Sequence, residues 1–136
     1  MANSTGFMNG DVSFQLLEDI DVSKLISAVR QGVDMEFFDS IASVSPFSLS
    51  EWSLLLHLSE RTMQRIRKEN RSFDPVQSEK ILQIALLYKK GIEVFGDKQK
   101  FDIWLATDNL ALGQVKPKEL LDNAFGIRLL TDELLR

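Results

Sequence analysis

Apolar residues recur at intervals of three and four positions along most of this chain, and this spacing places side chains on one face of an α-helix. The first such stretch begins at Phe14. Polar residues that can cap a helix precede most of the later ones. In the strongest start, Asp74-Pro75-Val76-Gln77, Asp can cap, Pro suits the first turn and Gln can reach back. The pattern predicts an all-α protein, with later helix starts at Asp21, Asp34, Ser48, Ser59, Asp74, Asp97 and Pro117.

Glycine and proline residues predict where these helices end. The helix that starts at Pro75 is expected to continue to Gly96, and its apolar residues cover more than one face. Such a helix is buried on more than one side, which predicts a central helix that joins two halves of the molecule. Residues 107–115 are expected to form a loop, and no alternating run predicts a β-hairpin. The other predicted ends are Gly32, Pro46, a break at His57, and Gly126, after which a last helix holds Ile127 to Leu135.

Residues 48–71 fit a helix, a tight turn and a second helix, the arrangement of helix-turn-helix DNA readers. In the second helix Met63 and Ile66 are expected to point inward, while polar and basic side chains fall outward. Arginine can read guanine, glutamine can read adenine, and lysine and threonine can contact phosphate. A solvated basic face on an ordinary helix pair fits the same pattern. The candidate DNA-binding residues are Arg61, Thr62, Gln64, Arg65, Lys68 and Arg71.

The single histidine, His57, stands in the predicted turn, where glycine is usual. Histidine is among the few residues other than glycine that tolerate the left-handed conformation, so a turn role is favoured over a catalytic one. The sequence contains no cysteine, no Gly-rich phosphate loop and no metalloprotease or serine-hydrolase motif. We therefore expect a protein that is not an enzyme and that holds no cofactor and no metal.

The charge distribution is compatible with DNA binding although the net charge is −4. Residues 51–90 carry eight basic and five acidic side chains, and an acidic protein with one local basic patch remains a plausible DNA binder. Residues 1–13 are expected to form a flexible tail, and the N-terminus has no basic stretch typical of a signal peptide. No apolar run is long enough to span a bilayer. These features predict a cytoplasmic protein with no membrane partner.

Short sequence motifs then follow one another in a fairly specific order, although none is specific alone. They are Ser59-Glu60-Arg61-Thr62, Ser78, Val94-Phe95-Gly96-Asp97, Trp104-Leu105, Asn109 with Leu112-Gly113, Pro117 with Leu120-Leu121, and Gly126. Through them the chain, from about Leu25 to Leu135, resembles the Xre–MbcA–ParS antitoxin family, whose partners are RES-domain toxins. The sequence departs from the family pattern at His57, which replaces the usual turn glycine, and at Lys116, where a capping threonine is expected.

The resemblance implies a type II antitoxin with an Xre-like helix-turn-helix, followed by a helical toxin-binding region around the long central helix. It also implies repression of the shared operon and a toxin that consumes NAD or transfers ADP-ribose from it. The expected division is a tail at 1–13, a helix-turn-helix domain at 14–73 and a toxin-binding domain at 74–136. The candidate toxin contacts are exposed positions near the C-terminal end, Gln114, Lys116, Lys118, Arg128, Asp132, Glu133 and Arg136.

A stand-alone helix-turn-helix repressor is the alternative reading. It explains residues 48–71 and gives the C-terminal half only a structural or dimerising role. Either reading predicts a homodimer, because two-fold symmetry lets a helix-turn-helix protein read a palindromic operator. The N-terminal helices and the central helix are the expected dimer interface.

Overall fold

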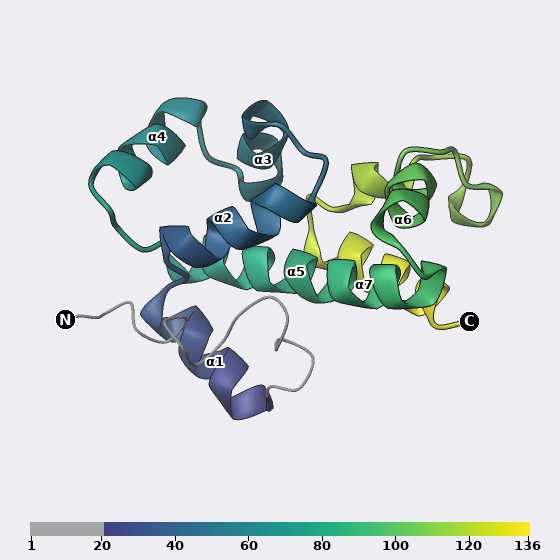
Figure 1. The fold of residues 1–136 in the computed structure, drawn as a ribbon, viewed down its shortest axis with the longest axis horizontal. Helices are drawn as coiled ribbons and strands as arrows, with labels where there is room; N and C mark the ends of the chain where they lie inside the picture. Colours follow the sequence, from purple (N-terminus) through teal and green to yellow (C-terminus); the bar gives the residue numbers. More distant parts are fainter. Residues whose placement is uncertain (1–20) are drawn as a thin grey trace.

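The computed structural model describes residues 21–136, so the tail expected at 1–13 and the helical stretch expected at 14–20 lie outside the described residues. Within that range the chain forms seven α-helices, two short 3-10 helices and no strand, which confirms the all-α prediction (Figure 1). The elements are α1 (Val22–Gln31), α2 (Met35–Val44), α3 (Leu49–Leu56), α4 (Glu60–Lys68), α5 (Pro75–Phe95), α6 (Lys98–Leu105), η2 (Leu110–Leu112), η3 (Pro117–Leu120) and α7 (Ala124–Leu134).

Most helix starts were predicted correctly, because a cap acts over only three positions of the chain. The Asp21 side chain accepts a hydrogen bond from the backbone N–H of Lys24 at 2.9 Å. Ser48 and Glu51 form the reciprocal capping box, with bonds of 3.1 and 3.0 Å. Each cap provides a partner for backbone donors that the first helical turn leaves unpaired. The same kind of cap is confirmed at Asp34, Ser59 and Asp97.

The capping role predicted for Asp74 and Gln77 is wrong, although the predicted helix start is correct. Asp74 stands at the N-cap position of α5, but no side-chain capping hydrogen bond is present there. Pro75 is the first helical residue and has no N–H, so this helix begins with one donor fewer to satisfy. The fixed φ of proline also favours the first turn without help from a side chain.

The prediction that a helix ends at Gly126 is also wrong. Asn123 is the N-cap of α7, and its side chain accepts a hydrogen bond from the backbone N–H of Gly126 at 2.8 Å, so Gly126 lies inside the first turn. A Cβ at this position would overlap the backbone carbonyl of Leu120 in η3. Glycine at 126 therefore allows η3 and α7 to pack closely.

Helix α5 is the centre of the fold, as the sequence predicted. Figure 1 shows it as the longest helix, with α1 near its N-terminal end and α6 and α7 along its other half. Gly91 is buried where the Phe101 ring of α6 crosses the helix, and a Cβ there would overlap that ring. The buried residues of α5 point to several sides and are Ser78, Ile81, Leu82, Ile84, Ala85, Leu87, Tyr88 and Gly91.

A buried polar contact fixes the start of α5 against the loop between α1 and α2. The Ser78 hydroxyl accepts a hydrogen bond from the backbone N–H of Val33 at 2.7 Å and donates to the carbonyl of Phe73 at 3.1 Å. The N–H of Phe73 in turn donates to the carbonyl of Val33 at 2.9 Å. These bonds satisfy polar groups that would be costly to bury unpaired.

The segment between α6 and η3 is the loop expected at residues 107–115. It contains η2 and one antiparallel bridge, in which the N–H of Asn109 donates to the carbonyl of Val115 at 2.9 Å. Gly113 and Gln114 both have positive φ, which reverses the chain at this point. Over residues 21–136 the helices are all too short or too polar to cross a membrane.

Candidate functional site

Helices α3 and α4 have the geometry of a helix-turn-helix. His57 follows α3 directly with a φ of 58°, in the left-handed region, which confirms its predicted turn role. On α4, Met63 and Ile66 are buried, as the sequence predicted. The opposite face of α4 is therefore turned away from the core and is available at the surface (Figure 1).

Four of the six predicted DNA-binding side chains lie together on this outer face of α4. Their positions follow the spacing i, i+3, i+4 and i+7, which places them on one side of a helix. All four are exposed, so three cations and one amide face solvent over about two helical turns. We call this set the basic face, and it consists of Arg61, Gln64, Arg65 and Lys68.

The other two predicted DNA contacts lie at the edges of the basic face and have local partners. Thr62 is half-buried, and its backbone N–H donates to the Ser59 hydroxyl at 3.0 Å, while its own hydroxyl oxygen accepts from the same group at 2.9 Å. Arg71 lies beyond the end of α4 and forms an ion pair with Glu69 at 2.9 Å. A DNA-binding role for all six residues remains a prediction.

Arg67, which the sequence did not single out as a site residue, holds α4 against α2. Its guanidinium donates two hydrogen bonds to the Asp39 carboxylate, at 3.0 and 2.7 Å. The hydrogen bonds to Asp39 raise the pKa of Arg67, so the guanidinium keeps its positive charge. This bidentate contact joins α4 to α2 at the surface, while the burial of Met63 and Ile66 sets the direction of the basic face.

A second exposed surface lies on one side of α7 and just beyond its end, and it includes three predicted toxin contacts. Arg128 and Asp132 lie four residues apart on α7. Arg136 follows after another four residues, two positions beyond the end of the helix. Phe125 and Leu129 occupy the same side, with 87% and 48% of their surface exposed. We call these five residues the mixed face. The sequence analysis missed Phe125 and Leu129, because the periodicity of apolar residues cannot distinguish a core side chain from an exposed one.

A groove with a volume of about 490 Å³ runs beside the mixed face, between α5 and α7. Its walls combine apolar side chains with charged ones at the rim. They are Gln83, Leu86, Leu87, Lys90, Ala124, Ile127, Arg128, Thr131 and Asp132. Arg128 and Asp132 therefore border both the groove and the mixed face.

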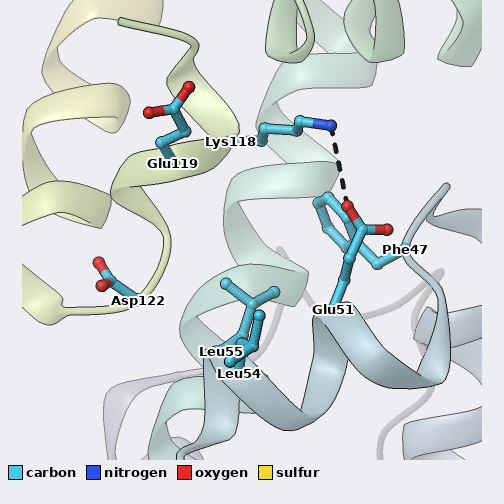
Figure 2. A pocket seen from close by; sticks show the side chains of 7 residues that line it. All are labelled: Phe47, Glu51, Leu54, Leu55, Lys118, Glu119 and Asp122. Atoms are coloured by element: carbon cyan, nitrogen blue, oxygen red, sulfur yellow. Dashed lines mark ion pairs between the residues drawn. The ribbon is translucent and has the colours of Figure 1, made fainter.

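The remaining predicted toxin contacts lie apart from this surface or are paired within the chain. Gln114 is exposed in the loop before η3, and Lys116 forms an ion pair with Asp108 at 3.3 Å. Glu133 lies near Arg136, with 3.5 Å between the charged atoms. Lys118 reaches toward Glu51 of α3, with 3.8 Å between ammonium and carboxylate (Figure 2).

The helix-turn-helix and the C-terminal segment meet around a hollow of about 290 Å³ (Figure 2). Leu54 and Leu55 of α3 line one side, and Asp122 lies on the opposite segment. Beside it, the backbone carbonyl of Asp122 accepts hydrogen bonds from His57 Nε2 at 3.0 Å and from Lys80 Nζ at 2.7 Å. Lys80 is a residue of α5, and burial lowers the pKa of its ammonium group.

The described residues offer no ready place for a metal ion. Nowhere in residues 21–136 do three histidine or acidic side chains gather closely enough to hold one.

Comparison with known proteins identifies both halves. The model of the family described as "Antitoxin Xre-like helix-turn-helix domain" matches residues 24–86, and the one described as "Antitoxin Xre/MbcA/ParS C-terminal toxin-binding domain" matches residues 90–136. The chain is also similar to a protein of Yersinia enterocolitica named Antitoxin Xre. The two are 26% identical over 103 residues, which cover 75% of this chain and 70% of the relative.

The first match begins within α1 and covers α2 to α4 with the basic face, and the second covers α6, α7 and the mixed face. The first match ends and the second begins within α5, the helix that packs against both halves. The family resemblance seen in the short motifs is thus confirmed, and the chain belongs to the Xre/MbcA/ParS antitoxin family.

Proposed function

We propose that this chain is the antitoxin of a type II toxin–antitoxin pair and neutralises a RES-domain toxin by binding it directly through the mixed face of α7. The observation that carries the proposal is the exposure of Phe125 and Leu129 in the domain that matches a toxin-binding family model. Large aromatic side chains contribute strongly to protein–protein interfaces when a partner buries them. Arg128, Asp132 and Arg136 would supply the polar rim.

The local structure supports this role because Phe125 is held in a fixed position. It lies between the cap formed by Asn123 and the close contact of Gly126 with η3. A side chain carried on a rigid backbone loses little conformational freedom when a partner binds it. Gln114 would contribute less because it lies in the loop before η3, apart from the mixed face. Lys116 and Lys118 would also contribute less, since each already has a partner elsewhere in the chain. Glu133 would act together with Arg136, its ion-pair partner.

We further propose that the basic face of α4 binds operator DNA and represses the operon that encodes the pair. Arg61, Gln64 and Arg65 would read bases, and Lys68 would contact phosphate. The protein would act as a homodimer in the cytoplasm, without catalysis of its own. Exposed apolar residues on α1 and at the start of α5 support the proposed dimer interface, and they are Val22, Ile26 and Val76.

The first test is genetic and biochemical. A reading frame for a RES-domain protein should lie beside the gene for this chain, and its expression should lower cellular NAD and arrest growth. Co-expression of the full chain should restore growth, while the purified chain alone should leave NAD intact. A chain that binds DNA but gives no protection, with no such neighbouring gene, would instead support the stand-alone repressor.

A further inference from the structure

His57 has a second contact that its turn role does not explain. Its ring Nε2 lies 3.0 Å from the backbone carbonyl of Asp122, which is 65 residues further along the chain. A carbonyl oxygen only accepts hydrogen bonds, so Nε2 carries the proton and donates. The turn of the helix-turn-helix is therefore bonded directly to the segment that precedes α7.

Lys80 of α5 strengthens the same junction. Its ammonium donates to the Asp122 carbonyl at 2.7 Å and also lies 3.5 Å from the carbonyl of Leu55, in the last turn of α3. On the other side of the hollow, Lys118 of η3 and Glu51 of α3 form the ion pair drawn in Figure 2. We call these contacts the seam. The seam joins α3, the turn, α5 and the segment before α7 at one place.

The position of Asp122 makes the seam relevant to both surfaces. Asp122 directly precedes Asn123, the cap of α7, and lies three residues before Phe125 of the mixed face. His57 lies two residues before Ser59, the cap of α4. A displacement of His57 is therefore only a few residues away from the basic face, and a displacement of Asp122 is only a few residues away from the mixed face.

We propose that His57 is a positioning residue that couples toxin binding on α7 to operator binding on α4. This inference rests on the proposed function. A toxin bound to the mixed face displaces the first turn of α7 and the Asp122 carbonyl just before it. The hydrogen bond from His57 to this carbonyl then moves the turn before α4. Arg67 and Asp39 hold the far end of α4 in place, so movement at the turn changes the orientation of the basic face.

Replacement of His57 by glycine separates its proposed coupling role from its role in the turn. Glycine adopts the left-handed conformation freely, so His57→Gly keeps the turn and removes only the ring. Asn70→Gly is the matched control. Asn70 has a φ of 52° two residues beyond the end of α4, so the change removes the side chain of another left-handed residue next to the same helix and leaves the seam intact.

The experiment measures the affinity of the full chain for a duplex from upstream of its own gene, with and without saturating purified RES-domain toxin. The reverse titration, toxin affinity with and without the duplex, is run in parallel. For the wild type we expect the toxin to change operator affinity by about fivefold or more, and the reverse titration to give the same factor by thermodynamic linkage. For His57→Gly both factors should fall to within about twofold of unity, while each separate affinity stays near that of the wild type. Asn70→Gly should behave like the wild type.

Coupling of undiminished size in His57→Gly would overturn the inference, and so would a wild-type factor of one or an equal loss in Asn70→Gly. Failure of the wild type to bind the toxin or the duplex at all would instead refute the proposed function, and the inference with it. The separate affinities therefore distinguish the two failures.

Discussion

The outer faces of α4 and α7 differ in chemistry although both belong to exposed amphipathic helices. The basic face of α4 carries three cations and one amide and no apolar side chain. The mixed face of α7 combines Phe125 and Leu129 with two arginines and one aspartate. A cationic polar face suits a polyanion, where affinity comes from phosphate contacts. An apolar centre with a charged rim suits a protein, where affinity comes from a few buried side chains.

This difference assigns the two partners to opposite ends of one small molecule. Helix α5 separates the two faces and is buried on several sides, so it provides the rigid connection between them. Substitutions on one face should therefore leave the other face able to bind its own partner, and the proposed coupling through the seam comes into play only when the toxin is bound. The predictions below test that separation, beginning with the largest expected effect.

Truncation of the mixed face should affect toxin binding most. Phe125→Ala combined with Leu129→Ala should weaken the affinity for the toxin by about 2–4 kcal/mol, or about thirtyfold to a thousandfold, if these are the central contacts. Because both side chains are exposed, the free energy of unfolding should change little. Calorimetric titration measures the affinity, and urea denaturation measures the stability.

Ile103→Ala is the control for this change, since Ile103 is an apolar side chain with 65% of its surface exposed but lies on α6, outside the mixed face. It should bind toxin like the wild type. If the double variant keeps wild-type toxin affinity, the toxin contact lies elsewhere, and the groove between α5 and α7 becomes the next candidate.

Truncation of the basic face should affect only DNA binding. Arg65→Ala should weaken operator binding by about 1–3 kcal/mol and relax specificity at one base pair, if it makes a bidentate contact. Lys68→Ala should weaken binding to every sequence and lower the slope of affinity against salt by about one phosphate. Fluorescence anisotropy at several salt concentrations separates the two effects.

Lys100→Ala is the control for the loss of one positive charge, because Lys100 is exposed on α6, in the other half of the molecule from α4. It should leave operator affinity nearly unchanged. Wild-type operator binding by both Arg65→Ala and Lys68→Ala would mean that the basic face does not contact DNA.

A buried tyrosine in the C-terminal half should make stability fall at alkaline pH. Tyr88 of α5 donates a hydrogen bond to Asp102 of α6, and burial together with this carboxylate raises the pKa of Tyr88 well above its usual value. Above about pH 10 the tyrosine of the unfolded chain ionises while the folded one stays neutral, so stability falls by up to about 1.4 kcal/mol per pH unit. Below that pH the contribution is fully present.

The variant Tyr88→Phe should lack this contribution, so its stability should fall less steeply above about pH 10 than that of the wild type. The urea concentration at the midpoint of unfolding, measured for both proteins from neutral to alkaline pH, compares their stabilities. Tyr88 is the only tyrosine, so phenolate absorbance of the folded protein reports on this one group. Phenolate formation near pH 10 in the folded wild type would contradict the prediction.

The smallest predicted effects are changes in stability from substitutions at two helix starts. Ser48→Ala breaks a capping box and should destabilise the protein by about 1 kcal/mol. Asp74→Ala removes a side chain that makes no capping bond and should change stability by less than about 0.5 kcal/mol. Thermal unfolding followed by circular dichroism measures both. An equal loss from the two changes would show that Asp74 stabilises α5 in another way.

The sequence predicted the features that depend on neighbouring residues. Caps such as Asp21 and the turn at His57 act within a few positions, so a single sequence reveals them. The role of Gly126 could not be seen in this way, because its cause is the contact between η3 and α7. The same is true of the bond between Arg67 and Asp39, which are 28 positions apart.

The candidate sites, too, were predictable where they depend on nearby residues and not where they depend on packing between distant segments. The basic face was predictable, because charged residues at helical spacing are solvated wherever the helix lies. The mixed face was found only in part, since Phe125 and Leu129 have the same apolar character as the buried residues of α7. Only the packing of α7 on α5 determines which apolar side chains remain outside.

The separation of the two partners can be tested most directly by the mobility of the operator duplex on a native gel. Wild-type chain should retard the duplex, and the toxin should change the mobility or the amount of that complex. The Phe125→Ala and Leu129→Ala double variant should retard the duplex as strongly as the wild type, and the toxin should then have no effect. A variant complex that still responds to the toxin, or a variant that no longer binds the duplex, would contradict the assignment of the two faces to two separate partners.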